Sequence, residues 1–191
     1  MSVEPLRIRV DETTELRTLQ EQEADVFYRL IERNRAYLRE WLPWLDSTVS
    51  VDDERLFIRL AQTQYMENRA MTCGIWYGGQ AAGTISYHPV DWVNRKVEIG
   101  YWLGAEFQGR GLVTKACQAM IEYAFSRLML NKVEIRCAVG NVKSCAIPQR
   151  LGFRQEGVIR QGEWLYDHFV DLKLYGLLAS EWQHQGFPHS R

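Results

Sequence analysis

A glycine-rich segment at residues 104–111 constrains the fold of this chain more than any other feature, because it separates a strand pattern from a helix pattern. Residues 96–103 alternate between apolar and polar side chains, which predicts a strand with one buried face. Residues 112–128 carry apolar side chains at helical spacing, which predicts a long helix. The chain must turn from strand to helix between them, and Gly109 and Gly111 supply the backbone freedom for that turn.

The remaining patterns predict a mixed α/β sheet in one domain. Further strands are expected at 6–10, 15–19, 71–77, 80–88, 133–139, 154–165 and 168–177, and further helices at 22–34, 52–68 and 144–151. The helix at 52–68 is inferred from the spacing of Leu56, Ile58, Leu60 and Tyr65. No repeat or long Pro/Gly/Ser linker divides the chain, so we expect a single domain over 1–191, with a core from about 6 to 180 and a tail at 181–191.

Charge, hydropathy and cysteine spacing exclude several functional classes. The 23 Lys and Arg against 24 Asp and Glu give a net charge of −1, without the basic excess of a nucleic-acid-binding surface. No run of about 18 apolar residues occurs, and the polar N-terminus lacks the apolar centre of a signal peptide. The 4 cysteines have no CxxC spacing and the 4 histidines no ligand spacing. We therefore expect a cytoplasmic protein with reduced thiols, no metal and no membrane or nucleic-acid partner.

The segment at 104–111 suits a phosphate group, since a glycine-rich turn into a helix turns backbone N–H groups outward. A nucleoside-triphosphate P-loop is excluded, because Leu-Val-Thr follows Gly111 where Lys and Ser or Thr are required. A dinucleotide fingerprint is weak, because Thr114 replaces the third glycine and Glu134 lies inside its strand. A plain strand-to-helix turn remains the alternative.

Three short motifs resemble one family. Residues 108–113 read Gln-Gly-Arg-Gly-Leu-Val, which resembles the Q/R-x-x-G-x-G/A signature of the GCN5-related N-acetyltransferases (GNAT), with Val113 in place of the usual small residue. Asn141 and Ser144, followed by Leu-Gly-Phe at 151–153, resemble the family's NxxS…LGF pattern. Trp-Leu-Pro-Trp at 41–44 is typical of the Rim branch, which acetylates the N-termini of ribosomal proteins. The resemblance spans roughly residues 6–180.

The resemblance implies a single-domain GNAT fold of α/β (α+β mixed) class. Its mixed, mostly antiparallel sheet would have about seven strands, splayed at the acetyl-CoA site and flanked by about four helices. It implies transfer of acetyl from acetyl-CoA to a primary amine by direct attack in a ternary complex, without a metal. The acceptor implied is the N-terminal α-amine of a ribosomal protein. A small-molecule amine (antibiotic, peptide toxin or polyamine), a non-catalytic acetyl-CoA-binding module and a homodimer remain open.

The resemblance also assigns residues that bind acetyl-CoA. Gly100 is expected at a bulge or close backbone approach, where a freed N–H would polarise the thioester carbonyl. The main chain beside it and Asn141 would hold the pantetheine arm, and the glycine-rich loop the pyrophosphate. The cofactor-binding set is Tyr101, Trp102, Leu103, Gln108, Gly109, Arg110, Gly111, Leu112, Val113 and Asn141.

Two catalytic roles follow from the same resemblance. Ser144 would protonate the departing CoA thiolate, its alternative being a helix N-cap. Glu163 matches the carboxylate that acts as a base through water in the serine-specific Rim enzymes, with Glu98 as the rival base. Cys137 is interpreted as a core cysteine near the thioester, able to form a disulfide with CoA, and not as an acyl carrier. The tryptophans at 41–44 either line the acceptor groove or cap the core.

Overall fold

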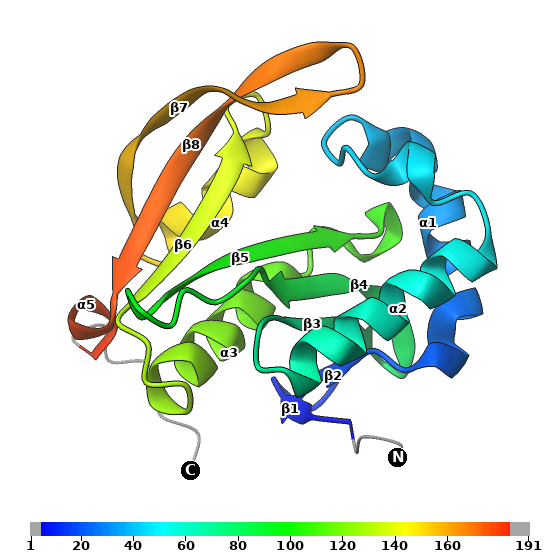
Figure 1. The fold of residues 1–191 in the computed structure, drawn as a ribbon, viewed down its shortest axis with the longest axis horizontal. Helices are drawn as coiled ribbons and strands as arrows, with labels where there is room; N and C mark the ends of the chain where they lie inside the picture. The colour runs from blue at the N-terminus through cyan, green and yellow to red at the C-terminus, as the bar shows by residue number, and fades with distance from the viewer. Residues whose placement is uncertain (1–4, 184–191) are drawn as a thin grey trace.

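The computed structural model describes residues 5–183, and within them eight strands form one sheet in the order β1-β2-β3-β4-β5-β6-β8-β7 (Figure 1). The strands are β1 (Arg7–Arg9), β2 (Thr14–Thr18), β3 (Met71–Tyr77), β4 (Gln80–Tyr87), β5 (Lys96–Leu103), β6 (Lys132–Ala138), β7 (Arg154–Leu165) and β8 (His168–Leu178). The α-helices are α1 (Ala24–Arg39), α2 (Val51–Met66), α3 (Leu112–Ser126), α4 (Val142–Arg150) and α5 (Ala179–Gln183). Short 3₁₀ helices are η1 (Glu21–Glu23), η2 (Leu45–Ser47) and η3 (Ala105–Phe107).

The predicted fold class is confirmed: the sheet is mixed and mostly antiparallel. β5 and β6 are parallel, and the other neighbouring strands are antiparallel. The resemblance implied about seven strands and four helices, whereas residues 5–183 form the eight strands that the residue patterns predicted and a fifth, short helix. The three-residue β1 pairs with β2 as an edge strand, and the chain continues after β8 into the short helix α5.

The two halves of the sheet separate between β5 and β6. These strands pair through three residues each, from Lys96 opposite Lys132 to Glu98 opposite Glu134, and then diverge (Figure 1). At the closed end the buried Glu134 carboxylate lies 3.4 Å from the Lys96 ammonium and 3.0 Å from that of Lys132. The splay expected from the resemblance is therefore present, and it leaves one side of β5 without a neighbouring strand.

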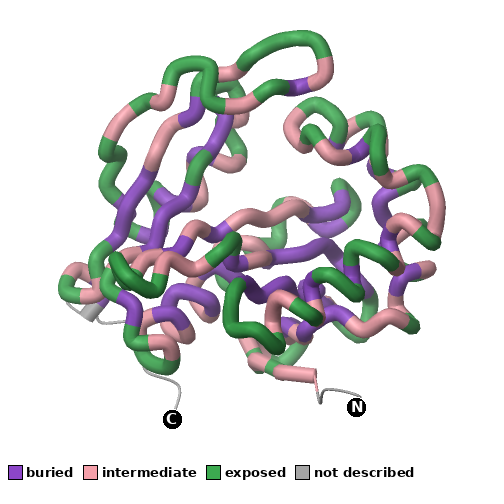
Figure 2. The backbone as a smooth tube through the Cα atoms, in the orientation of Figure 1, coloured by how far each residue is buried: buried purple, intermediate pink, exposed green. Residues whose placement is uncertain are grey.

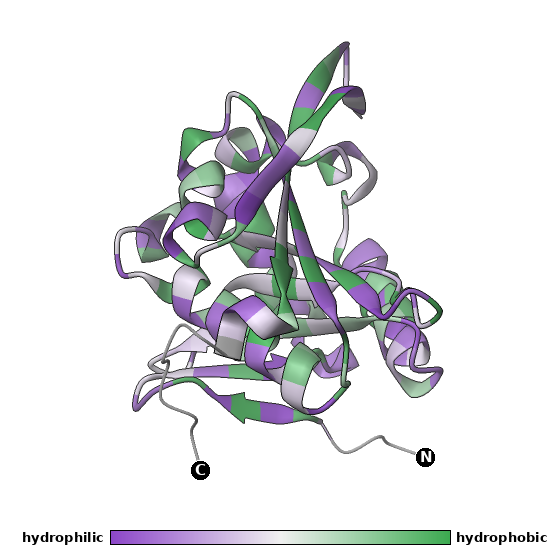
Figure 3. Cartoon of the chain, turned by 90° about the vertical axis from the view of Figure 1, so that its left-hand side faces the viewer, coloured by the Kyte–Doolittle hydropathy of each residue, from purple (hydrophilic) through white to green (hydrophobic). Residues whose placement is uncertain are grey.

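The core lies between the sheet and its helices; β3, β4 and β6 are mostly buried, whereas the edge strand β7 is largely exposed (Figure 2). The strands alternate between hydrophobic and hydrophilic residues, and the helices carry both kinds (Figure 3). α3 packs against β4, β5 and β6 through the predicted apolar stripe. α1 and α2 pack against each other, α1 also against β4 and α2 against β3. The expected core end near residue 180 is slightly short, since Trp182 is buried; residues 184–191 lie outside the described part.

The helix expected at 52–68 is present as α2, but two of the apolar residues from which it was inferred are not on its buried face. Leu56 and Leu60 are 52% and 55% exposed, and the buried positions are Glu54, Ile58 and Ala61. The spacing of these three, four residues and then three, is that of a single helical face. The two leucines lie beside it and border a cavity, which is why they are not buried.

Candidate active site

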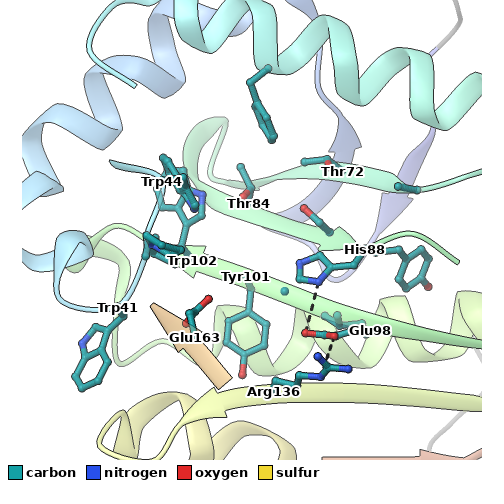
Figure 4. A pocket seen from close by; sticks show the side chains of 18 of the residues that line it. Trp41, Trp44, Thr72, Thr84, His88, Glu98, Tyr101, Trp102, Arg136 and Glu163 are labelled. Atoms are coloured by element: carbon teal, nitrogen blue, oxygen red, sulfur yellow. Dashed lines mark ion pairs between the residues drawn. The ribbon is translucent and has the colours of Figure 1, made fainter. Parts of the chain in front are cut away.

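A cavity of about 840 Å³ lies where β5 and β6 diverge. Its walls come from α1, α2, β3, β4, β5, β6, α4 and β7, so residues distant in sequence meet there. Six of the sequence-predicted site residues line it: Glu98, Tyr101, Trp102, Asn141, Ser144 and Glu163. The tryptophans at 41 and 44 also line it, and Trp44 lies against Trp102 with ring centroids 6.4 Å apart (Figure 4). Leu103 is a buried core residue.

The backbone of β5 presents alternate residues to the gap. The Glu98 carbonyl accepts from His88 N–H, and Gly104 N–H donates to the Ala82 carbonyl, so these even-numbered residues bond to β4. Because main-chain groups alternate along an antiparallel ladder, Gly100 and Trp102 also face β4, and Tyr101 and Leu103 face the gap. The β4–β5 register runs unbroken past Gly100. The bulge and the freed N–H expected at Gly100 are therefore wrong.

Gly100 makes room for an imidazole. A Cβ at this position would lie 2.5 Å from the Nε2 of His88, so a side chain there would displace the ring. The same imidazole lies, through Nδ1, 3.5 Å from the Glu98 carboxylate, whose other oxygen is 3.2 Å from Arg136 Nε (Figure 4). Glu98, the rival base, is thus held between the imidazole of His88 and the guanidinium of Arg136.

Glu163 has a different environment. No hydrogen bond or ion pair engages its carboxylate within residues 5–183. Partial burial raises its pKa above the usual value, the nearby Glu98 carboxylate raises it further, and His88 opposes the shift. A carboxylate with a raised pKa and no partner is free to accept a proton, whereas the Glu98 carboxylate is engaged by Arg136.

Ser144 is the third residue of α4, and Asn141 is the N-cap of that helix. The Asn141 side-chain oxygen accepts from Ser144 N–H at 3.1 Å, so the N-cap alternative for Ser144 is wrong. The Ser144 Oγ lies 3.2 Å from the Tyr101 hydroxyl and 3.2 Å from the Cys137 Sγ. Burial raises the pKa of Cys137 to about 12, so its thiol stays protonated and is a poor nucleophile.

The glycine-rich loop is shaped to receive an anion. Gly109 and Gly111 have φ of +75° and +73°, and nothing lies within 4 Å of a Cβ built at either. Within the described chain, the backbone N–H groups of residues 109–114 have no acceptor. They cluster at the N-terminus of α3, where the helix dipole also favours negative charge. Leu112 is buried and Val113 packs against the core, so their side chains leave the amides uncovered.

Neighbouring side chains fix and flank this loop. The buried Asn34 of α1 accepts from Ala105 N–H at 2.8 Å and donates to the Glu106 carboxylate at 3.1 Å. Arg110 lies over the Tyr77 ring at 5.5 Å, and Lys143 donates to Gln108. The sequence reasoning missed Asn34, although an asparagine on the buried face of a helix signals a polar contact.

Three further cavity residues escaped the sequence reasoning: Glu54, His88 and Arg136. The position of Glu54 in register with Ile58 and Ala61 would have revealed a carboxylate on a buried face. Among residues 5–183, no group of three or more His, Cys, Asp or Glu side chains is arranged to hold a metal ion. In the same part of the chain, no helix has both the length and the apolar character to cross a membrane.

Comparisons with known proteins identify the family of this chain. Residues 14–154 match the acetyltransferase (GNAT) domain family. The chain is 41% identical over 176 residues to the Bacillus subtilis (strain 168) protein YdaF, covering 92% of this chain and 96% of YdaF. It is 32% identical over 168 residues to the ribosomal-protein-serine acetyltransferase of Escherichia coli (strain K12), covering 88% and 94% of the two chains.

Solved structures give the same result. RimL, a ribosomal L7/L12 α-N-protein acetyltransferase in complex with coenzyme A, superposes with a TM-score of 0.89 at 27% identity, covering 92% of this chain and 99% of RimL. The microcin C7 self-immunity acetyltransferase MccE, in complex with acetyl-CoA and AMP, superposes with a TM-score of 0.86 at 32% identity, covering 90% and 95%. The chain belongs to the GNAT family of acetyltransferases.

Proposed function

We propose that this enzyme transfers acetyl from acetyl-CoA to the N-terminal α-amine of a ribosomal protein, by direct attack in a ternary complex. The observation that carries the proposal is the cavity at the splay, which Ser144 and the unpaired Glu163 both line. The similarity to the E. coli ribosomal-protein-serine acetyltransferase and to RimL supports this acceptor.

The residues fit acetyl-CoA. The free amides at 109–114 match a pyrophosphate, and the outward-facing main chain of Tyr101 and Leu103 matches an extended arm with amide groups. The Asn141 side-chain oxygen is used in capping α4, and its NH₂ is left to donate into the cavity. RimL, which resembles this chain, was solved with coenzyme A joined to one of its cysteines by a disulfide. Cys137, beside Ser144, is our candidate for the same contact.

The proposed chemistry divides between two side chains. Glu163 accepts, through water, the proton that the attacking amine loses; an α-amine with a pKa near 8 is already partly neutral at physiological pH. The amine nitrogen forms the new C–N bond at the thioester carbonyl as the C–S bond to CoA breaks, and Ser144 donates its Oγ proton to the departing thiolate. Ser144 then regains a proton from water and Glu163 releases its own to solvent, which restores both side chains. Positioning of amine and thioester contributes the rest of the rate. Cys137 carries no acyl group, because its thiol stays protonated.

A small-molecule amine is the second candidate acceptor, supported by 32% identity to the microcin C7 self-immunity acetyltransferase. A thiol-release assay with acetyl-CoA, a panel of N-terminal peptides and small amines distinguishes the two. We expect turnover on Ser- or Ala-starting peptides that is lost in Ser144→Ala and Glu163→Gln. Turnover confined to small amines would contradict the ribosomal acceptor. Tight binding of acetyl-CoA without turnover would indicate a non-catalytic acetyl-CoA-binding module.

A further inference from the structure

Glu54 is a buried carboxylate without a partner. It is 3% exposed, lies on the core face of α2 and lines the cavity. Within residues 5–183 its side chain makes no hydrogen bond and no ion pair. The preceding residue differs: the Asp53 carboxylate accepts from Val49 N–H at 3.0 Å and from the Ser50 hydroxyl at 2.8 Å. Asp53 therefore stabilises the start of the helix, whereas the Glu54 carboxylate makes no polar contact that would stabilise the fold.

No basic side chain among the residues that line the cavity pairs with the Glu54 carboxylate. Four carboxylates line it, those of Asp53, Glu54, Glu98 and Glu163. The basic side chains that line it are the guanidinium of Arg136 and the imidazole of His88, and both lie against Glu98. The walls thus have an excess of negative charge, and two of the carboxylates remain unpaired.

An unpaired buried carboxylate is unfavourable when it is ionised, and either a proton or a cationic group of a ligand relieves that cost. We propose that Glu54 binds a second positively charged group of the acceptor, separate from the amine that is acetylated. The acceptor class is therefore a basic one: a chain end or small amine with two cationic groups. This inference rests on the proposed function for the identity of the reacting amine.

The two unpaired carboxylates come from opposite halves of the molecule. Glu54 is on α2, which covers β3, and Glu163 is on β7, the outer strand of the other half of the sheet (Figure 1). An acceptor whose amine reaches Glu163 extends the rest of its length along the cavity. Glu54 is placed to bind a positive charge on the part of the acceptor beyond the reacting amine. It therefore determines acceptor specificity and takes no part in the chemistry.

The test uses tetrapeptides that begin with serine and carry either lysine or methionine at the second, third or fourth position. Each is titrated calorimetrically into the enzyme–CoA complex, which measures acceptor affinity without turnover, and each is also assayed for acetylation. The variants are Glu54→Gln, which removes the charge and keeps the shape, and Asp52→Asn. Asp52 is an exposed residue of the same helix turn, does not line the cavity and pairs with Arg55, so it controls for charge alone.

We expect the wild-type complex to bind a lysine peptide about ten- to hundred-fold more tightly than its methionine partner at one position at least. Glu54→Gln is expected to bring that ratio to about one, and Asp52→Asn to keep it. No preference in the wild type, or a preference that survives Glu54→Gln, overturns the inference. A Glu54-dependent preference without acetylation of any peptide would uphold this subsite and refute the proposed reaction instead.

Discussion

The hydroxyl of Ser144 donates a hydrogen bond to the hydroxyl of Tyr101 at an Oγ–Oη distance of 3.2 Å, linking α4 to β5 across the splay. The Tyr101 hydroxyl donates in turn to the Ser144 carbonyl, also at 3.2 Å. Burial raises the pKa of Tyr101 well above its usual value, so the phenol stays neutral. The pair holds the Ser144 side chain at the cavity wall.

Replacing Ser144 by alanine should lower kcat and leave cofactor affinity intact. Loss of a general acid typically reduces the rate by about 10²–10⁴-fold, and the loop amides at 109–114 that would bind pyrophosphate are untouched. Steady-state kinetics and a calorimetric Kd for acetyl-CoA test this. Tyr101→Phe, which removes the contact and keeps Ser144, should have a smaller effect on kcat. A Ser144→Ala enzyme with wild-type kcat would refute the assigned role.

The pH profile should identify the base. If Glu163 must be ionised, kcat/KM rises with pH through its pKa, which burial and Glu98 place above the usual value. Glu98→Gln removes a neighbouring negative charge and leaves Arg136 unpaired, and both changes lower the pKa of Glu163. The limb that Glu163 contributes should therefore move to lower pH in Glu98→Gln and disappear in Glu163→Gln, which keeps only the limb of the acceptor α-amine, whose pKa is near 8. Loss of the limb in Glu98→Gln would make Glu98 the base.

Sequence patterning predicted the strands, the central helices and the position of the loop, because periodicity reports which side chains are buried. Patterning failed where an apolar residue is exposed or a charged residue is buried. Leu56 and Leu60 are apolar and border a cavity, while Glu54 is charged and buried. Contacts between distant residues could not be predicted either. The packing of the His88 ring against Gly100 and the ion pair between Arg136 and Glu98 both depend on how the strands pair. Ser144 and Glu163 were singled out through resemblance alone, and their catalytic roles stay predictions.

Val113 departs from the family signature, and we expect the departure to be harmless. Its side chain packs against the core and leaves the backbone amides exposed. Val113→Ala should lower the free energy of unfolding by about 1 kcal/mol and leave the Kd for acetyl-CoA unchanged. Gly111→Ala should instead weaken acetyl-CoA binding, because the φ of +73° at this position disfavours a residue with a side chain, and a shift of the backbone there would displace the anion-binding amides. Improved acetyl-CoA affinity in Val113→Ala would contradict this view.

Glu54 should make stability depend on pH. Burial raises its pKa to about 7 from a model-compound value of 4.5. Between these two values the folded protein holds a proton that the unfolded chain releases, so the free energy of unfolding falls as pH rises and levels off above pH 7. The loss amounts to roughly 3 kcal/mol.

Glu54→Gln should match the wild type at pH 4 and exceed its stability at pH 8 by up to about that amount. Urea unfolding at both pH values measures the difference, with Asp52→Asn as the control. Equal stability at pH 8 would mean that the folded protein already neutralises Glu54, and no ligand charge would then be needed to keep it ionised.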